Sequence, residues 1–572
     1  MKKTVLGFST LLSVAFTFAQ TNVTDINQTG KGNEIEVSQK GVNNVLSIAE
    51  EGNFNKAKVE QGTQDSSKGN GMISQIQTGD QNNVYVMQLG DFNVVHQNQL
   101  GNSNYAEAIQ DSYVLESKIQ QTQIGNHNIA VAFQGVSIDF VFAENFKNSI
   151  VQSQRGNFNI AQANQSDTEN NIRIIIQDQE GEFNQATANQ NFFLGHKYSI
   201  EQRQSGEYNS AVATQDEGNF SQNNIVQDQK GSGNTLDANQ SSQPHGLGDN
   251  SINQSQNGNY NNATAIQNNG YSITQNQIGD FNQAYAQQEP QEFSIIDQYQ
   301  EGIRNIAYAS KDKIDQFGTR PSFISQNQIG EDNHVSATIG GRGFVTQKQE
   351  GVRNDASSIH IYGYNIRANQ KQTGEDNKVV VNSSFSSSSQ EFEVLLQQDQ
   401  VGNYNEATAI LQNGIDTKIT QTQEGERNAV VAQSNGIGNE IWSIQKGGFN
   451  VIEQTQDNIG SRAIAAQYGN SNSILQTQSK GGVNIMEATQ NNMQFSGEEN
   501  LLSQLQHGNT NMMVSAQDGS FNTTYATQIG DSNSFNTKQI GNANSLTASQ
   551  EGTSLSVTII QEGNGNSSVI SQ

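Results

Sequence analysis

The residues that could carry chemistry are few and scattered. The seven histidines, which include His96, His127, His196 and His334, show no metal-ligand spacing such as H-E-x-x-H. We therefore interpret them as ordinary surface or loop residues. With no cysteine, the chain has no thiolate metal site, no cysteine nucleophile and no disulfide.

Acidic residues are numerous but follow no catalytic or metal-binding pattern. The sequence has 56 Asp and Glu residues, yet no D-x-D-x-D-G calcium loop and no glycine-aspartate nonapeptide run. We interpret the isolated carboxylates as charges that slow aggregation of strand faces. A secreted β-helix enzyme would need two converging carboxylates, which a sequence alone cannot exclude. The prediction is no catalytic residue, no metal site and no cofactor.

The composition excludes most globular enzymes. About a quarter of the 572 residues are Asn or Gln, 33% are hydrophobic and 15% are charged, against roughly 45–50% apolar and 25% charged in an ordinary domain. A single large apolar core is not expected. The net charge of −26 argues against nucleic acid as a partner, because phosphate binding needs clustered Lys and Arg.

The first residues have the features of an export signal. Lys2 and Lys3 precede a largely apolar run from Val5 to Phe18, and Thr17 and Ala19 supply small residues at the two positions that a signal peptidase reads. We expect a signal peptide at residues 1–19, a repeat domain at 20–572 and a secreted protein at the cell surface or outside the cell. No later stretch reaches the roughly 20 apolar residues of a membrane helix, so no membrane insertion is expected.

A glycine repeat organises the rest of the chain. Gly30, Gly41 and Gly52 recur every 11 residues, and the same spacing returns from Gly508 to Gly552. In the middle the spacing widens, for example to 25 residues between Gly206 and Gly231. Most of these glycines begin a G-x-x-N motif. A fixed period of this kind indicates a stacked solenoid.

Between the turns, residue types alternate with period two, which is typical of strands. In the unit from Ser199 to Gln215, charged and hydroxyl residues such as Glu201, Arg203 and Thr214 fall on one face. The opposite, inward face forms the predicted structural ladder: Gln202, Gln204, Gly206, Asn209, Ala211, Ala213 and Gln215. Each unit is therefore predicted to be strand, tight turn, strand.

These units predict an all-β fold, a β-solenoid of roughly 24 stacked two-strand coils with cross-β-like pairing. Buried amides are costly when unsatisfied, by roughly 1–3 kcal/mol each, but identical amides stacked in register can bond to the copies above and below. Pro244, Pro290, Pro321 and the serine-rich stretch from Ser383 to Ser389 all follow the second strand of a unit. We expect every long loop to lie on one edge of the stack.

The unit S-I-x-Q-x-Q-x-G-x-x-N-x-A-x-x-x-Q, at Ser199–Gln215, Ser251–Gln267 and Ser272–Gln288, closely resembles the curlin repeat of curli subunits. Curli are extracellular amyloid fibres of bacterial biofilms. The resemblance implies self-association into fibres, export through a curli-type secretion pore, nucleator-like partner subunits and a role in matrix and adhesion. Curlin subunits have about five repeats, far fewer than this chain.

Many turns carry an aromatic residue directly before the asparagine, for example Phe158, Phe183 and Tyr208. In consecutive coils these rings could form an aromatic ladder that binds sugars, dyes or another fibre. The simpler interpretation, which we favour, is that the rings cover the turns and strengthen stacking.

Two functions from different classes therefore lead. The first is a structural subunit of extracellular curli-like fibres in the biofilm matrix. The second is a monomeric secreted β-solenoid that acts as an adhesin or carbohydrate-binding surface.

Overall fold

The computed structural model describes residues 22–62, 69–111, 114–136, 147–167, 172–191, 197–216, 222–241, 249–268, 271–289, 294–312, 322–360, 365–384, 393–491 and 499–572. These residues form 46 strands, and no helix occurs among them. The predicted signal peptide at 1–19 lies outside the described residues. The chain divides into two compact units, Met1–Arg203 and Gln204–Gln572, and the same repeat occurs in both.

The first unit contains fourteen complete strands, and β15 (Lys197–Glu207) spans the boundary between the units. The strands of the first unit are β1 (Val23–Thr29), β2 (Glu34–Gln39), β3 (Val45–Glu51), β4 (Lys56–Gln61), β5 (Met72–Thr78), β6 (Asn83–Gln88), β7 (Val94–Leu100), β8 (Tyr105–Gln110), β9 (Lys118–Ile124), β10 (Ile129–Val136), β11 (Ser149–Asn157), β12 (Ile160–Asp167), β13 (Ile172–Glu182) and β14 (Gln185–Asn191).

The second unit contains the strands from β16 onward. Those up to β32 are β16 (Ser210–Asp216), β17 (Gln222–Ser232), β18 (Thr235–Ser241), β19 (Asn250–Asn257), β20 (Asn262–Asn268), β21 (Ser272–Asp280), β22 (Gln283–Gln288), β23 (Ser294–Ile303), β24 (Ile306–Lys311), β25 (Ser322–Glu331), β26 (His334–Ile339), β27 (Gly343–Val352), β28 (Asp355–His360), β29 (Ile366–Glu375), β30 (Lys378–Ser384), β31 (Val394–Asn403) and β32 (Glu406–Ile415). The remaining strands are β33 (Lys418–Glu426), β34 (Ala429–Ile437), β35 (Glu440–Gly448), β36 (Val451–Ile459), β37 (Arg462–Tyr468), β38 (Ser473–Gly482), β39 (Ile485–Asn491), β40 (Leu501–His507), β41 (Met512–Asp518), β42 (Thr523–Asp531), β43 (Ser534–Ile540), β44 (Ser545–Thr553), β45 (Ser556–Glu562) and β46 (Ser567–Ser571).

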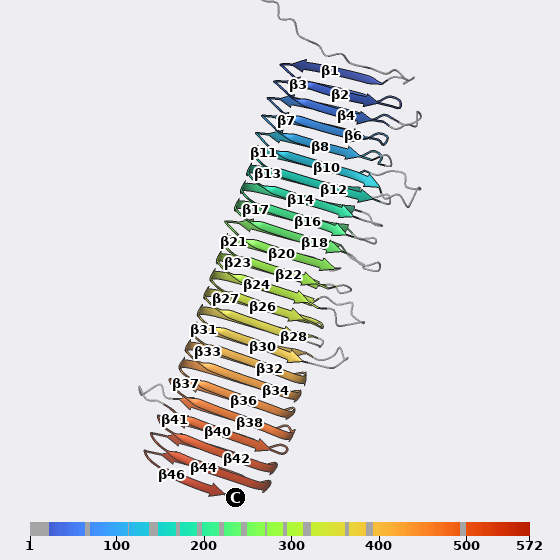
Figure 1. The fold of residues 1–572 in the computed structure, drawn as a ribbon. Coiled ribbons are helices and arrows are strands. Elements are labelled where there is room, and N and C mark those ends of the chain that lie inside the picture. Colours follow the sequence, from blue (N-terminus) through green and yellow to red (C-terminus); the bar gives the residue numbers. More distant parts are fainter. Residues whose placement is uncertain are drawn as a thin grey trace, which may run out of the picture. The chain divides into compact units, whose positions relative to one another are not determined.

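Each unit is a parallel β-solenoid with two sheets. Odd-numbered strands pair with odd-numbered strands and even-numbered with even-numbered, always in parallel, as in β11 with β13 and β10 with β12. Figure 1 shows these strands lying coil upon coil within each unit. Two strands per coil give 23 coils for the 46 strands, close to the roughly 24 predicted. The predicted fold class is confirmed.

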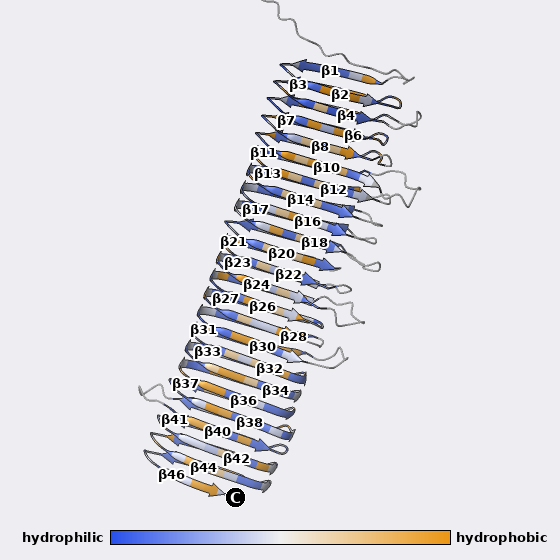
Figure 2. Ribbon diagram, viewed as in Figure 1, coloured by the Kyte–Doolittle hydropathy of each residue, from blue (hydrophilic) through white to orange (hydrophobic). Residues whose placement is uncertain are grey.

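The core lies between the two sheets and is only partly apolar. In β6 the burial alternates strictly, so that Val84, Val86 and Gln88 are buried while the residues between them are not. Figure 2 shows hydrophobic and hydrophilic segments mixed along the strands. Small apolar side chains and amides together fill the narrow interior, as the period-two pattern predicts.

The turns depend on glycine because consecutive coils approach closely there. Gly231 has a φ of 119°, and a Cβ atom built on it would lie 2.0 Å from the carbonyl oxygen of Gly258. No side chain fits in that space. Two residues after each such glycine the backbone enters the left-handed region, as at Tyr260 with a φ of 54°. The asparagine that follows directly precedes the next strand, as Asn261 precedes β20.

The prediction that all long loops lie on one edge is wrong for the second unit. Pro244, Pro290 and Pro321 lie outside the described residues, but each falls after an even-numbered strand and before an odd-numbered one. Residues 492–498, by contrast, lie between β39 and β40, after an odd-numbered strand. Long connections therefore follow strands of one sheet early in this unit and a strand of the other sheet at residues 492–498.

The cause is an extra half-coil in the repeat. Strands with two inward glutamines are odd-numbered up to β33, where Gln421 and Gln423 face inward, and even-numbered from β36, where Gln454 and Gln456 do. Between them the glycines Gly425, Gly436 and Gly447 keep the 11-residue spacing. One coil consists of two 11-residue halves, one in each sheet. An odd number of halves separates β33 from β36, so the double-glutamine strands pass from one sheet to the other.

Candidate functional site: inward ladders and end coils

The predicted ladder glutamines point inward and bond to their copies in neighbouring coils. Gln202 accepts a 2.8 Å hydrogen bond from Nε2 of Gln177 in the first unit. In the second unit Gln204 donates to Oε1 of Gln229 at 2.9 Å, and Gln215 donates to Oε1 of Gln240 at 2.8 Å. All of these side chains are buried.

One of these amide ladders continues through most of the second unit. Each glutamine donates from Nε2 to Oε1 of the glutamine in the next coil, through Gln204, Gln229, Gln256, Gln277, Gln300, Gln328, Gln349, Gln372, Gln400, Gln423, Gln445, Gln467, Gln490, Gln517, Gln539 and Gln561. The ladder has a direction, because every donor lies earlier in the chain than its acceptor.

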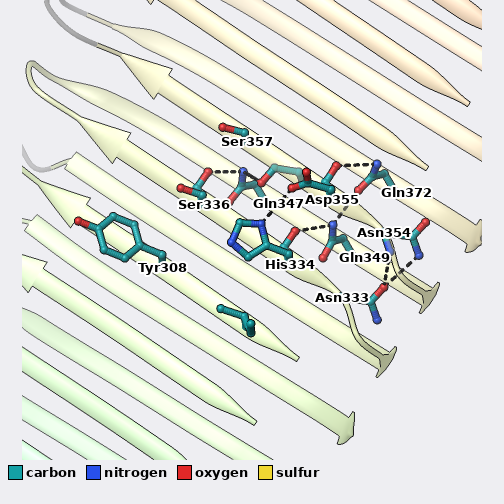
Figure 3. Close-up of polar contacts among 12 residues, drawn as sticks. Tyr308, Asn333, His334, Ser336, Gln347, Gln349, Asn354, Asp355, Ser357 and Gln372 are labelled. Atoms are coloured by element: carbon teal, nitrogen blue, oxygen red, sulfur yellow. Dashed lines mark hydrogen bonds and ion pairs between the residues drawn. The ribbon is translucent and has the colours of Figure 1, made fainter. Parts of the chain in front are cut away.

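The second amide hydrogen of a ladder glutamine connects the two sheets. Gln349 on β27 donates to the carbonyl oxygen of His334 on β26 at 2.9 Å, and Gln372 on β29 donates to that of Asp355 at 3.0 Å (Figure 3). Both amide hydrogens are therefore used. A buried amide in this position is satisfied on all sides without water.

The predicted turn residues Gly206 and Asn209 join neighbouring turns. A Cβ atom on Gly206 would lie 1.9 Å from the carbonyl oxygen of Gly231. The Asn209 side chain donates to that same carbonyl at 2.8 Å, and its oxygen accepts from the backbone nitrogen of Asn234 at 3.1 Å. Each asparagine thus bonds to the following coil through both ends of its amide.

The two predicted alanines are both buried between the sheets. Ala211 packs in a buried cluster with Leu236, Ala263 and Ala284. Ala213 is opposite Ala238 in the strand register and has 0% exposure. Six of the seven predicted ladder residues are therefore buried, and Gly206 lies partly exposed in the turn.

The ladder in the even-numbered strands of the second unit has an interruption that was not predicted from the sequence. Between Gln288 and Gln456 the same inward position is occupied by Lys311, Ile339, His360, Ser383, Leu411 and Ser434. The sequence shows that these strands lack the final glutamine, but only the strand register shows that the replacing residues occupy one continuous inward column.

The interpretation of the histidines as surface residues is wrong for His360. This ring is fully buried, 3.0 Å from the Ser358 hydroxyl through Nε2 and hydrogen-bonded to Ser383 through Nδ1. Burial lowers the pKa of His360 to about 3, so the ring is neutral at physiological pH. His196 lies outside the described residues.

The turn aromatics stack face to face. The rings of His127 and Phe158 lie 4.8 Å apart, and those of Phe158 and Phe183 lie 4.9 Å apart with an interplanar angle of 2°. In the second unit Tyr260 and Phe281 stack at 5.2 Å. Because neighbouring rings cover each other's faces, only the edges of the inner rings are free. This geometry favours a stacking role over a platform for sugars.

Further along the turns of the second unit, charged pairs replace the rings. Arg304 bonds to Asp332 at 2.7 Å and Arg353 to Asp376 at 2.8 Å. Arg427 lies between two rings, 5.2 Å from Tyr404 and 5.3 Å from Phe449. Stacked rings, Arg–Asp pairs and Arg–ring contacts therefore all occur at this turn position.

The outward faces carry scattered polar and charged pairs. His334 and Asp355, 3.0 Å apart and about half exposed, point toward one another on the outer face (Figure 3). Exposed pairs of this kind contribute at most about 1 kcal/mol each. Within the described ranges no group of three or more His, Asp or Glu side chains could hold a metal ion, and no described helix is long and apolar enough to cross a membrane.

The outermost described coils have neighbours on one side only. β1 and β2 pair with β3 and β4, while β45 and β46 pair with β43 and β44. No other described strand covers their remaining edges. Such edges present unpaired backbone N–H and C=O groups and can accept a further strand.

Part of the repeat matches a known protein family. The family model of the curlin associated repeat matches residues 541–572, a span that includes β44, β45 and β46. No curated protein matches the chain. The resemblance inferred from the repeat motif is thus confirmed at the last described coils.

Proposed function

We propose that this chain, which carries a curlin associated repeat at residues 541–572, is a structural subunit of extracellular curli-like fibres. The observation that carries the proposal is the match between the two outermost coils. Their inward residues are of the kinds found throughout the stack, and each coil has one uncovered edge among the described strands.

The partner that fits these edges is a second copy of the chain. If β45 and β46 of one copy stack on β1 and β2 of the next, the repeat register places Gln561 beside Gln28 and Gln572 beside Gln39. In the same register Ile559 meets Ile26. The contact would continue both the amide ladders and the apolar columns.

The direction of the ladders supports head-to-tail addition. Gln39 donates to Gln61 at 2.8 Å, and Gln539 donates to Gln561 at 2.7 Å. Glutamine amides in both units therefore donate toward the later coil. An added copy places its acceptor oxygens at Gln28 and Gln39 against the donors of Gln561 and Gln572, whereas two identical ends would present the same groups to each other.

The extracellular location and the export partners are part of the same proposal. The basic and apolar residues 1–19 support export, and the resemblance to curli subunits supports a dedicated secretion pore and a nucleating partner. The contribution to the cell would be mechanical, in biofilm matrix, adhesion and aggregation. None of the described ladder residues requires a catalytic role.

Electron microscopy of the purified mature chain at several concentrations tests the proposal. Fibres that bind amyloid dyes should form faster at higher concentration. Ile570→Lys puts a charge on the inward face of the last strand and should prevent growth, while Val569→Lys, at a residue that is 80% exposed, should not. A chain that remains monomeric under all conditions would instead favour a solitary adhesin.

A further inference from the structure

One ladder of the first unit contains an acid among its amides. Its inward column runs through Gln28, Glu50, Gln77, Gln99, Gln123, Gln154 and Gln179 on the odd-numbered strands. Glu50 stands where the repeat motif otherwise has glutamine before x-G-x-x-N. It is 2% exposed, on β3, between β1 and β5.

Every step of this column is hydrogen-bonded except the one after Glu50. Gln28 donates to Oε2 of Glu50 at 2.8 Å, and Gln77 donates to Oε1 of Gln99 at 3.1 Å. Between them, Oε1 of Glu50 and Oε1 of Gln77 are both buried and both lack a partner. The register places these two residues directly opposite each other.

The missing bond has a simple chemical cause. At the other steps the earlier residue supplies an amide N–H, and an ionised carboxylate has no hydrogen to supply. Two buried acceptors then face each other, which is unfavourable. A protonated carboxyl group has one O–H donor and the same shape as the amide, so it can complete the step.

Within the described ranges, no counter-charge holds Glu50 in its ionised form. Lys56 and Glu34, on the facing even-numbered strands, point outward and pair with each other at 3.4 Å. Glu51, the next residue on β3, is exposed. Gln77 donates its amide hydrogens to Oε1 of Gln99 and to the carbonyl oxygen of Lys56. Among the described residues no cation pairs with Glu50.

We propose that Glu50 is a proton-controlled link in the ladder of the first unit. When protonated it donates its O–H to Oε1 of Gln77 and joins the coil of β3 to that of β5. When ionised it breaks this step and loosens the coils of β1 to β4. The switch acts within one molecule and does not depend on assembly into fibres.

The electrostatics agree with this geometry. Burial raises the pKa of Glu50 from 4.5 to about 7, although the hydrogen bond from Gln28 opposes the shift. Because the folded state holds the proton more tightly, stability is full below about pH 4.5 and is lost as the pH rises to about 7. The switch therefore opens near neutral pH.

Hydrogen exchange of the full mature chain, kept dilute and monomeric, tests the proposal. After correction for the intrinsic pH dependence of exchange, the opening equilibrium of β1 to β4 should rise by roughly two orders of magnitude between about pH 4.5 and about pH 7. Glu50→Gln restores the amide donor and should keep these strands protected across the range. Glu51→Gln removes an exposed neighbouring charge and should behave as the parent chain.

An infrared difference spectrum between the parent and Glu50→Gln gives a second readout. A protonated carboxyl band should be present at about pH 5.5 and absent at about pH 8.5. Equal pH dependence of exchange in the parent and Glu50→Gln, or a carboxylate band at the lower pH, would overturn the proposal.

Discussion

Ser443 on β35 donates a hydrogen bond across the interior to Oε1 of Gln454 on β36. The bond lies where the double-glutamine strands change sheets, so the preceding residue in the Gln454 column is Ala432, which has no amide. The short ladder that begins at Gln454 continues to Gln504, whose amide donates to the hydroxyl of Ser515 at 2.8 Å. A serine from the facing sheet thus closes each end.

This relationship predicts unequal effects at the two serines. Ser443→Ala leaves Oε1 of Gln454 buried without a donor and should reduce local stability by about 1–3 kcal/mol. Ser515→Ala should cost less, because Gln504 still donates to the carbonyl oxygen of Glu487 at 3.1 Å. Hydrogen exchange of β35 and β36 in one variant, and of β40 and β41 in the other, compares the two losses. Equal protection in both variants would contradict the assignment.

The inward and outward assignment of strand residues can be tested at two neighbours. Ala213 has 0% exposure, whereas Thr214 is only partly buried on the outer face. Ala213→Lys should cost several kcal/mol, roughly 3 or more, because a long cation replaces a methyl group. Thr214→Lys should cost about 0.5 kcal/mol or less.

Because coils contact only their neighbours, the damage from Ala213→Lys should remain local. Limited proteolysis should reveal a new cut between Gly206 and Lys230 in this variant and not in Thr214→Lys. The opposite order of sensitivity would show that the facing of β16 is wrong.

A second pair of variants tests the close approach of the turns. Gly231→Ala puts a methyl group 2.0 Å from the carbonyl oxygen of Gly258, so neighbouring coils must separate. In Gly565→Ala nothing lies within 4 Å, although φ is +72°, and only the left-handed strain of about 1–2 kcal/mol remains. Thermal unfolding should therefore show a much larger loss for Gly231→Ala. Similar losses would mean that backbone strain, and not contact between coils, requires the glycines.

The buried histidine predicts acid sensitivity in the second unit. The pKa of His360 is lowered to about 3 from 6.5 by burial, so the unfolded state binds the proton first. Stability around β28 should therefore be present above about pH 6.5 and fall as the pH drops toward 3. His360→Gln should remove this dependence, as measured by hydrogen exchange of β28 and β30. His334→Gln, at a half-exposed residue on the outer face, is the control.

Assembly should depend on salt. The net charge of −26 makes chains repel one another, and added salt screens that repulsion over about 10 Å at 0.1 M ionic strength. Fibre growth, followed by dye fluorescence, should be slow at low ionic strength and faster with salt. Growth that slows as salt is added would mean that attraction between opposite charges drives the contact.

The sequence by itself determined the strand and turn pattern and the facing of most side chains. The alternation that places Gln202 and Gln204 inward and Arg203 outward is local, because successive side chains of any strand point to opposite faces. The glycine and asparagine of each turn are equally local, since they follow from the backbone conformations that those residues adopt easily.

Only the tertiary structure decided what each inward residue meets. Glu50 and Gln77 are 27 residues apart, and His360 and Ser383 are 23 apart, so loop lengths set the pairings. The exchange of sheets near β34 likewise follows from counting half-coils along the second unit. A ladder bond joins two residues from different coils, and whether a buried amide, acid or imidazole is satisfied depends on the side chain that the register places beside it.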